Sequence, residues 1–133
     1  MIALCEVIPE RDRGLLFNLL AERTPDQSIS HRYMPTWQEH CAFVANHPYK
    51  VWYVIADDDV GAYVGSIYLS PRREVGVAVL NEYRRRGYAQ AAIAHLRELH
   101  PGPLLANVNP ANAPSHKLWE SLGGKIIQVT YEV

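Results

Sequence analysis

Hydrophobic and polar residues follow two different periods along this chain, and the two periods predict helices and strands in a definite order. Apolar positions three or four residues apart predict helices at residues 10–23, 36–46, 88–99 and 112–124. Alternating or continuous apolar runs rich in β-branched and aromatic residues predict strands at residues 3–9, 50–56, 62–70, 73–80, 104–108 and 125–133. The predicted order is therefore β-α-α-β-β-β-α-β-α-β.

The ends of the predicted helices carry local signals. Thr36 and Glu39 have the spacing of a capping box, which predicts that the second helix begins at Thr36. Asn112 is a predicted N-cap, and Gly123-Gly124 a predicted stop, for the last helix. One side of the first helix holds three leucines and one charged residue at helical spacing: Leu16, Leu19, Leu20 and Arg23.

This order of elements predicts an α/β (α+β layered) fold, with a central mixed, mostly antiparallel sheet flanked by helices. The step from strand 73–80 through helix 88–99 to strand 104–108 is a βαβ crossover, so those two strands should be parallel. A length of 133 residues favours one domain over residues 1–133.

Composition excludes several classes of function. The net charge of -1 gives no basic field for nucleic acid, and no apolar stretch approaches the length of a membrane span. Cys5 and Cys41 are far apart and form no CxxC pair, which is typical of reduced thiols in the cytoplasm. No signal peptide is visible, and the histidines have no metal-ligand spacing, so we expect a cytoplasmic protein without a metal.

Three consecutive arginines, Arg84 to Arg86, stand with Gly87 between a predicted strand and a predicted helix. The free N–H groups at a helix N-terminus attract anions, a glycine lets an anion approach the backbone, and arginines add donors. The pattern therefore predicts a cradle for a phosphate or pyrophosphate. A basic, solvated loop explains the same residues, and the residues alone leave both interpretations open.

The stretch "VLNEYRRRGYAQAAI" resembles the acetyl-CoA-binding signature of the GNAT N-acetyltransferase superfamily, (Gln/Arg)-x-x-Gly-x-(Gly/Ala). Downstream, "NPANAPSHKLWESLGGK" resembles that family's Asn-x-x-Ser/Ala followed by an aromatic residue and Gly-Phe. Two positions depart from the pattern: Asn81 stands where the family often has proline, and Gly123-Gly124 replaces Gly-Phe. The order of the elements fits the family over nearly the whole chain.

The resemblance implies acetyl-CoA as co-substrate. Backbone N–H groups of residues 85–89 would hold its pyrophosphate, and two arginine side chains would add charge. Backbone groups at the end of strand 73–80 would pair with the pantetheine amides, provided that this strand diverges from strand 104–108. Asn112 would hydrogen-bond the pantetheine arm, with Ser115 nearby. The cofactor-binding residues implied are Ala78, Val79, Arg84, Arg85, Arg86, Gly87, Tyr88, Ala89, Asn112 and Ser115.

The resemblance also implies direct transfer of an acetyl group to the primary amine of a small acceptor, with the Val79 N–H as donor to the thioester oxygen. Glu74 is the first candidate for the base, although it could instead form a surface ion pair with Arg72 or Arg73. His31 is the second candidate.

The general acid is less clear from the resemblance. Trp119 falls where many members have a tyrosine proposed as general acid, and an indole N–H only donates a hydrogen bond. Tyr68 on the neighbouring strand is a candidate replacement. Otherwise coenzyme A leaves as the thiolate.

Residues 30–56 are weakly similar to bacterial amino-sugar N-acetyltransferases, and His31, Arg32 and Tyr33 are the candidate acceptor-binding residues. A peptide N-terminus or a polyamine stays open as the acceptor, although no strongly acidic loop favours polyamines. A catalytically silent, acyl-CoA-binding regulatory module is the alternative function. Members of the family are often dimers, so a homodimer is one expectation.

Overall fold

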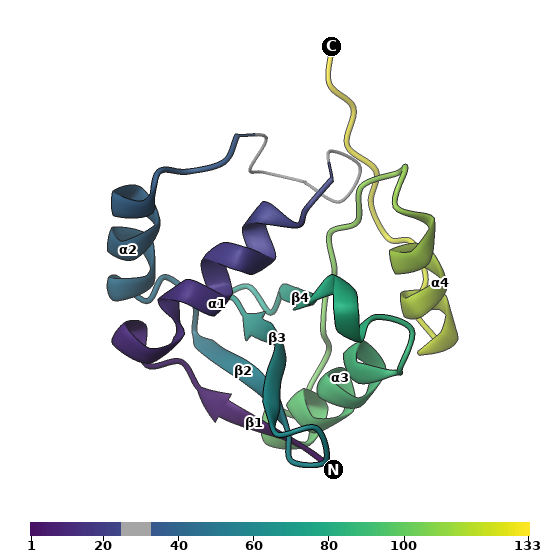
Figure 1. The fold of residues 1–133 in the computed structure, drawn as a ribbon. Coiled ribbons are helices and arrows are strands. Elements are labelled where there is room, and N and C mark those ends of the chain that lie inside the picture. The colour runs from purple at the N-terminus through teal and green to yellow at the C-terminus, as the bar shows by residue number, and fades with distance from the viewer. Residues whose placement is uncertain (25–32) are drawn as a thin grey trace.

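The computed structural model describes residues 1–24 and 33–133, which form one four-stranded sheet and four α-helices (Figure 1). A short 3-10 helix, Asn81–Tyr83, lies between the last strand and the third α-helix. In chain order the other elements are β1 (Ile2–Glu6), α1 (Pro9–Ala21), α2 (Trp37–Ala45), β2 (Val51–Asp57), β3 (Ala62–Leu69), β4 (Val75–Val79), α3 (Tyr88–Leu99) and α4 (Ala113–Ser121). The predicted fold class, a layered α+β arrangement with a mostly antiparallel sheet, is confirmed.

The strands lie side by side in the order β1-β2-β3-β4, and each neighbouring pair is antiparallel. Successive side chains of a strand point to opposite faces, so the sheet supports two separate apolar cores. On one face, buried side chains of β2 and β3 such as Ile55 and Ile67 pack with Ile93 and Leu96 of α3. On the other face the helices are α1 and α2, with a core of Val7, Leu16, Leu19, Val44, Trp52 and Val54.

The helices begin where local polar contacts satisfy their free N–H groups. Thr36 and Glu39 form the predicted capping box at the start of α2, with hydrogen bonds of 2.9 and 3.2 Å. At the start of α1, the fully buried Asp12 accepts a hydrogen bond of 2.8 Å from the Ile8 N–H and two more hydrogen bonds from the Arg11 guanidinium. These contacts fix α1 and α2 against the sheet.

Two predicted strands do not form. Residues 104–108 make a single parallel bridge, between Leu105 and Glu74, so their predicted direction is correct but no continuous ladder follows. Residues 125–133 alternate in the predicted way, but their apolar side chains lie exposed and the segment pairs with no strand in the described chain. An alternating pattern gives a strand only where a sheet edge is available to pair with it, and here that edge is not engaged.

Among the described helices, none is long and apolar enough to cross a membrane. Cys5 and Cys41 are half-buried and are not bonded to each other.

Candidate functional site

The ladder between β3 and β4 determines which backbone groups of β4 are free. The Leu80 N–H donates to Val64 O at 2.9 Å, and the Ser70 N–H donates to Glu74 O at 2.9 Å, so these two pairs are hydrogen-bonded. In an antiparallel ladder, such pairs alternate with pairs whose backbone groups point away from the partner strand. The even-numbered residues of β4 therefore bond to β3, and the odd-numbered ones direct their N–H and C=O groups to the outer edge.

This register bears on the predicted pantetheine site. The backbone groups of Ala78 face β3, so they do not fit the role that the resemblance implied for them. Val77 and Val79 present theirs at the outer edge instead. There, only Val75 is engaged by the next segment, through a 2.7 Å hydrogen bond from its N–H to Leu105 O. Within the described residues no further bridge joins the two segments, so they diverge beyond this point, as the predicted slot requires.

Beyond β4, the chain forms an open backbone turn at the start of α3. Arg85 and Gly87 have φ angles of 64° and 79°, the left-handed conformation that directs successive N–H groups to one side. Gly87 is the N-cap of α3, and no side chain caps it. A Cβ on Gly87 would meet no atom within 4 Å, so the space beside Gly87 is open. The turn has the geometry of an anion cradle.

The arginine side chains stay beside this turn. The Arg84 Nε donates to Val79 O at 3.2 Å. The Arg86 guanidinium lies 5.5 Å from the Tyr83 ring centroid and donates to Glu82 O at 3.3 Å. All three arginines are exposed, so they add positive charge to the surface around the turn.

Tyr88 ties the turn to the rest of the molecule. Its side chain is buried, and its hydroxyl donates a 2.5 Å hydrogen bond to the buried carboxylate of Asp57. This bond, with that from the Asp59 N–H, holds the pKa of Asp57 below its usual range, and the same carboxylate raises the pKa of Tyr88. Asp57 opens the sequence "DDDVG", whose three aspartates predict a solvated hairpin tip. The structure instead places it at the end of β2, where it anchors the first turn of α3.

A cavity of about 670 Å³, hereafter the slot cavity, lies between β4 and residues 107–109 and extends under α1 and α2. Asn112 and Ser115 at the start of α4 line it, and the Asn112 side-chain oxygen accepts a 3.2 Å hydrogen bond from the Ser115 N–H. The predicted N-cap is thus confirmed. The structure brings both residues to the same cavity as Glu74 and Tyr68.

Glu74 is held by neutral donors and not by arginine. Its carboxylate accepts hydrogen bonds from the Asn107 side-chain amide and from the Ser70 hydroxyl. Arg73 instead donates to the backbone oxygens of His100 and Pro103. Among the residues that the structure describes, no ion pair involves Glu74, so the surface-pair alternative loses its support.

Tyr68 lies over β4 beside Glu74. A Cβ on Gly76 would come within 2.0 Å of the Tyr68 ring and 2.5 Å of its hydroxyl, so the ring occupies the space that the glycine leaves. The other face of the ring stacks on Tyr49, with centroids 3.7 Å apart and planes 8° from parallel. Burial, and then the neighbouring Tyr68 hydroxyl, raise the pKa of Tyr49.

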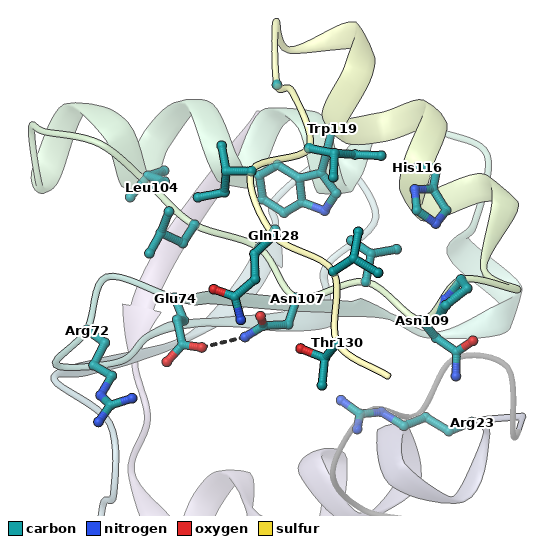
Figure 2. A pocket seen from close by; sticks show the side chains of 18 of the residues that line it. Arg23, Arg72, Glu74, Leu104, Asn107, Asn109, His116, Trp119, Gln128 and Thr130 are labelled. Carbon is teal, nitrogen blue, oxygen red and sulfur yellow. Dashed lines mark hydrogen bonds between the residues drawn. The ribbon is translucent and has the colours of Figure 1, made fainter. Parts of the chain in front are cut away.

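A second, larger cavity of about 1620 Å³, hereafter the tail cavity, lies between residues 104–110, α4 and the C-terminal segment (Figure 2). Figure 2 shows Arg23 reaching toward it from the end of α1, and Glu74 bonded to Asn107 on the other side. His116 lines the tail cavity but not the slot cavity. The two cavities meet at a shared wall: Leu20, Arg23, Pro35, Glu74, Asn107, Val108, Asn109 and Trp119.

The predicted acceptor-binding residues are only partly placed. Tyr33 lines the tail cavity and is strongly exposed. His31 and Arg32 lie outside the described residues. In the part of the chain that the structure describes, no three His, Cys, Asp or Glu side chains are grouped as a metal site would need.

Three residues of the site do not follow from the sequence motifs. Asn107 is a polar residue within a short apolar run, and that break is a usable signal. Arg23 continues a stripe of leucines on α1, where a charged residue is out of pattern. Tyr49 has no such signal, because its stacking on Tyr68 joins the loop before β2 to the end of β3, and only the folded sheet brings these together.

Comparison with known proteins identifies the class. The model of the acetyltransferase (GNAT) family matches residues 15–124, so the chain belongs to this family. None of the proteins of curated function matches the chain by sequence.

Several solved structures share the fold. A domain from Methanocaldococcus jannaschii has a TM-score of 0.76 at 20% identity, covering 99% of this chain and 93% of that one. Spermidine N-acetyltransferase from Vibrio cholerae, in complex with CoA and spermine, has a TM-score of 0.76 at 18% identity, covering 92% and 79%. A putative acetyltransferase from Salmonella typhimurium with acetyl-CoA has a TM-score of 0.68 at 15% identity, also covering 92% and 79%.

Proposed function

We propose that the protein is an acetyl-CoA-dependent N-acetyltransferase that transfers the acetyl group directly to the primary amine of a small acceptor. The observation that carries the proposal is the continuity of three features on one strand. Glu74 stands just before β4, the outer edge of β4 pairs with no strand from Val77 onward in the described residues, and the uncapped N-terminus of α3 follows. Family membership supports this assignment, as do the solved structures of the same fold that carry CoA or acetyl-CoA.

The residues present fit coenzyme A. The open space at Gly87 and the left-handed turn at Arg85 suit a pyrophosphate on the backbone N–H groups of residues 85–89. Arg84 and Arg86 add positive charge beside it. The backbone groups of Val77 and the N–H of Val79 offer the amide-pairing groups that an extended pantetheine arm needs, while Val79 O already accepts from Arg84 Nε. The Asn112 side-chain amide, whose oxygen is used by the helix cap, offers its N–H donors to the same arm.

Acetyl-CoA supplies the acetyl group, and the amide C–N bond forms as the thioester C–S bond breaks. Glu74 accepts the proton that the acceptor amine loses, directly or through water. The outward N–H of Val79 donates to the carbonyl oxygen on which negative charge develops. The Tyr68 hydroxyl, placed over Gly76 on the same face as Glu74, supplies a proton to the departing sulfur. Trp119 lines the cavity as a hydrogen-bond donor and an apolar wall.

The test is release of coenzyme A thiol from acetyl-CoA in the presence of a panel of primary amines, with the acetylated product identified by mass spectrometry. Thiol release that requires an amine and gives an N-acetyl product supports the proposal. Tight binding of acetyl-CoA without turnover of any amine would favour a silent acyl-CoA-binding module instead.

A further inference from the structure

We propose that the acceptor is an amino acid with an aromatic or large apolar side chain: a small zwitterion whose carboxylate binds Arg23 while its amine faces Glu74. This inference rests on the proposed function and names the substrate class of that same site. The geometry behind it is the wall shared by the two cavities, where one cation and one anion reach the same space from different elements.

Arg23 is a guanidinium directed into this space. It follows the C-terminal end of α1, lines both cavities and is exposed within them. Figure 2 shows its side chain extending from α1 toward the middle of the tail cavity. Its charge also lowers the pKa of Tyr49 in the slot cavity, against the larger effect of burial. Over residues 1–24 and 33–133, no carboxylate forms an ion pair with it. Arginine binds carboxylates with two parallel hydrogen bonds, so it is suited to an anionic group of the acceptor.

The other charged groups that line the slot cavity are engaged elsewhere and do not compete with Arg23 and Glu74 for the acceptor. Glu39 is engaged by the Thr36 backbone at the start of α2, which lowers its pKa. His40 is almost fully buried, and its Nε2 contacts Arg13 O at 2.8 Å. Among the described acidic residues, Glu74 is the one that lines both cavities, at the same shared wall as Arg23. One cation and one carboxylate at the described part of this shared wall match a zwitterion, whereas a polyamine would bring a second positive charge to Arg23.

One group of side chains that line the slot cavity is apolar and aromatic. Tyr49 and Tyr68 are stacked, Trp52 meets Tyr49 edge-on at 4.8 Å, and Phe43 meets Trp52 at 5.9 Å. Leucines of α1 complete this side of the cavity: Leu16, Leu19 and Leu20. Such a surface favours an apolar or aromatic side chain by burial and by ring contacts. Polar side chains also line the slot cavity, among them Ser66, Ser70, Asn109 and Asn112, so the preference for an amino acid over an amino sugar rests on this aromatic and apolar group.

The test compares kcat/KM for four amines at saturating acetyl-CoA: phenylalanine, phenylalaninamide, phenethylamine and spermidine. The first three differ only at the carboxylate. We expect phenylalanine to exceed phenylalaninamide by about tenfold or more, as a charge-assisted hydrogen bond implies. In Arg23→Gln this ratio should fall below about threefold, mainly through KM, because Arg23 binds the acceptor and takes no part in the chemical step. Arg72→Gln removes an exposed arginine that lines only the tail cavity, and it should keep the wild-type ratio.

The outcomes separate this inference from the proposed function. Acetylation of phenethylamine or spermidine as efficiently as phenylalanine would keep the N-acetyltransferase and overturn the zwitterion acceptor. A ratio unchanged in Arg23→Gln would likewise overturn it. If acetyl-CoA binds and neither these amines nor the wider amine panel is acetylated, the proposed function fails, and this inference fails with it. Acetylation only of an amine that is not an amino acid keeps the proposed function and overturns the zwitterion acceptor.

Discussion

Replacement of Gly76 by alanine tests the position of Tyr68, on which the proposed proton donor depends. The added methyl group would come within 2.0 Å of the Tyr68 ring and 2.2 Å of the carbon that bears its hydroxyl. Real contacts of this kind require well over 3 Å, so the ring must leave its place. Gly76 lies in a strand and has no positive φ, so the effect comes from this clash and not from backbone strain.

The magnitude follows from two terms. Overpacking in a folded core costs about 1–3 kcal/mol. Loss of the Tyr49–Tyr68 stack adds about 0.5–1.5 kcal/mol. A total of about 1.5–4.5 kcal/mol corresponds to a fall in Tm of roughly 5–17 °C for a chain of this length. We also expect turnover to fall about as far as in Tyr68→Phe, which removes the hydroxyl but keeps the ring.

The assay is thermal and denaturant unfolding, followed by kcat at saturating substrates. Gly14→Ala is the matched control, because a Cβ at Gly14 meets no atom within 4 Å, and it should be neutral or slightly stabilising. In Tyr68→Ala, the further change Gly76→Ala should cost little, since the clash is gone. If Gly76→Ala matches the wild type in stability and turnover, Tyr68 does not lie over β4 and its proposed role is refuted.

Three further changes probe other parts of the site. Glu74→Gln should lower kcat by about 10²–10⁴-fold with little change in the Kd of acetyl-CoA. Replacement of the exposed Glu98 on α3 by glutamine should change neither quantity. Full turnover in Glu74→Gln would refute the role of Glu74 as the base. Tyr88→Phe removes the hydroxyl that holds the Asp57 pKa low. The wild type gains stability from ionised Asp57 at a pH above the usual carboxyl pKa, and it loses that stability as the pH falls toward the lower pKa of the folded state. The fall in Tm from pH 7 to about pH 3 should therefore be smaller in the variant. An equal fall in both proteins would contradict the Asp57–Tyr88 link. Asn112→Ala should lose about 1 kcal/mol of stability from the helix cap and also weaken acetyl-CoA binding. Asn112→Ser should keep the cap and lose only affinity for acetyl-CoA. Equal Kd values in the wild type and both variants would show that Asn112 does not belong to the cofactor site.

The sequence predicts most of the fold because its signals are local. The capping box at Thr36, the N-cap at Asn112 and the apolar face of residues 88–99 each act within a few residues, and all three are observed. The wrong predictions are strands 104–108 and 125–133. Both segments have apolar patterns typical of strands, but neither forms a continuous ladder with an edge of the described sheet. Pairing is a property of two segments, so the pattern of one cannot determine it.

The site divides in the same way. The turn at Gly87 is predictable because glycine, arginines and the helix start are neighbours in sequence. Whether Ala78 or Val77 directs its backbone groups to the outer edge depends on which β3–β4 pairs are hydrogen-bonded. These pairs alternate from one residue to the next, and the sequence of neither strand determines which ones they are. The contacts of Glu74 with Asn107 and of Tyr68 with Tyr49 join distant segments, so only the folded chain reveals them.

The measurement that tests the central claim most directly is calorimetric titration of acetyl-CoA into the wild type, Gly87→Glu and Gly123→Glu. Gly87 and Gly123 have similar φ angles, 79° and 84°, and a Cβ at either meets open space, so the two variants share the same backbone strain and the same added charge. We expect micromolar binding in the wild type and Gly123→Glu, and none in folded Gly87→Glu, whose carboxylate would enter the cradle. Equal binding by all three proteins, or no binding by the folded wild type, would contradict the account.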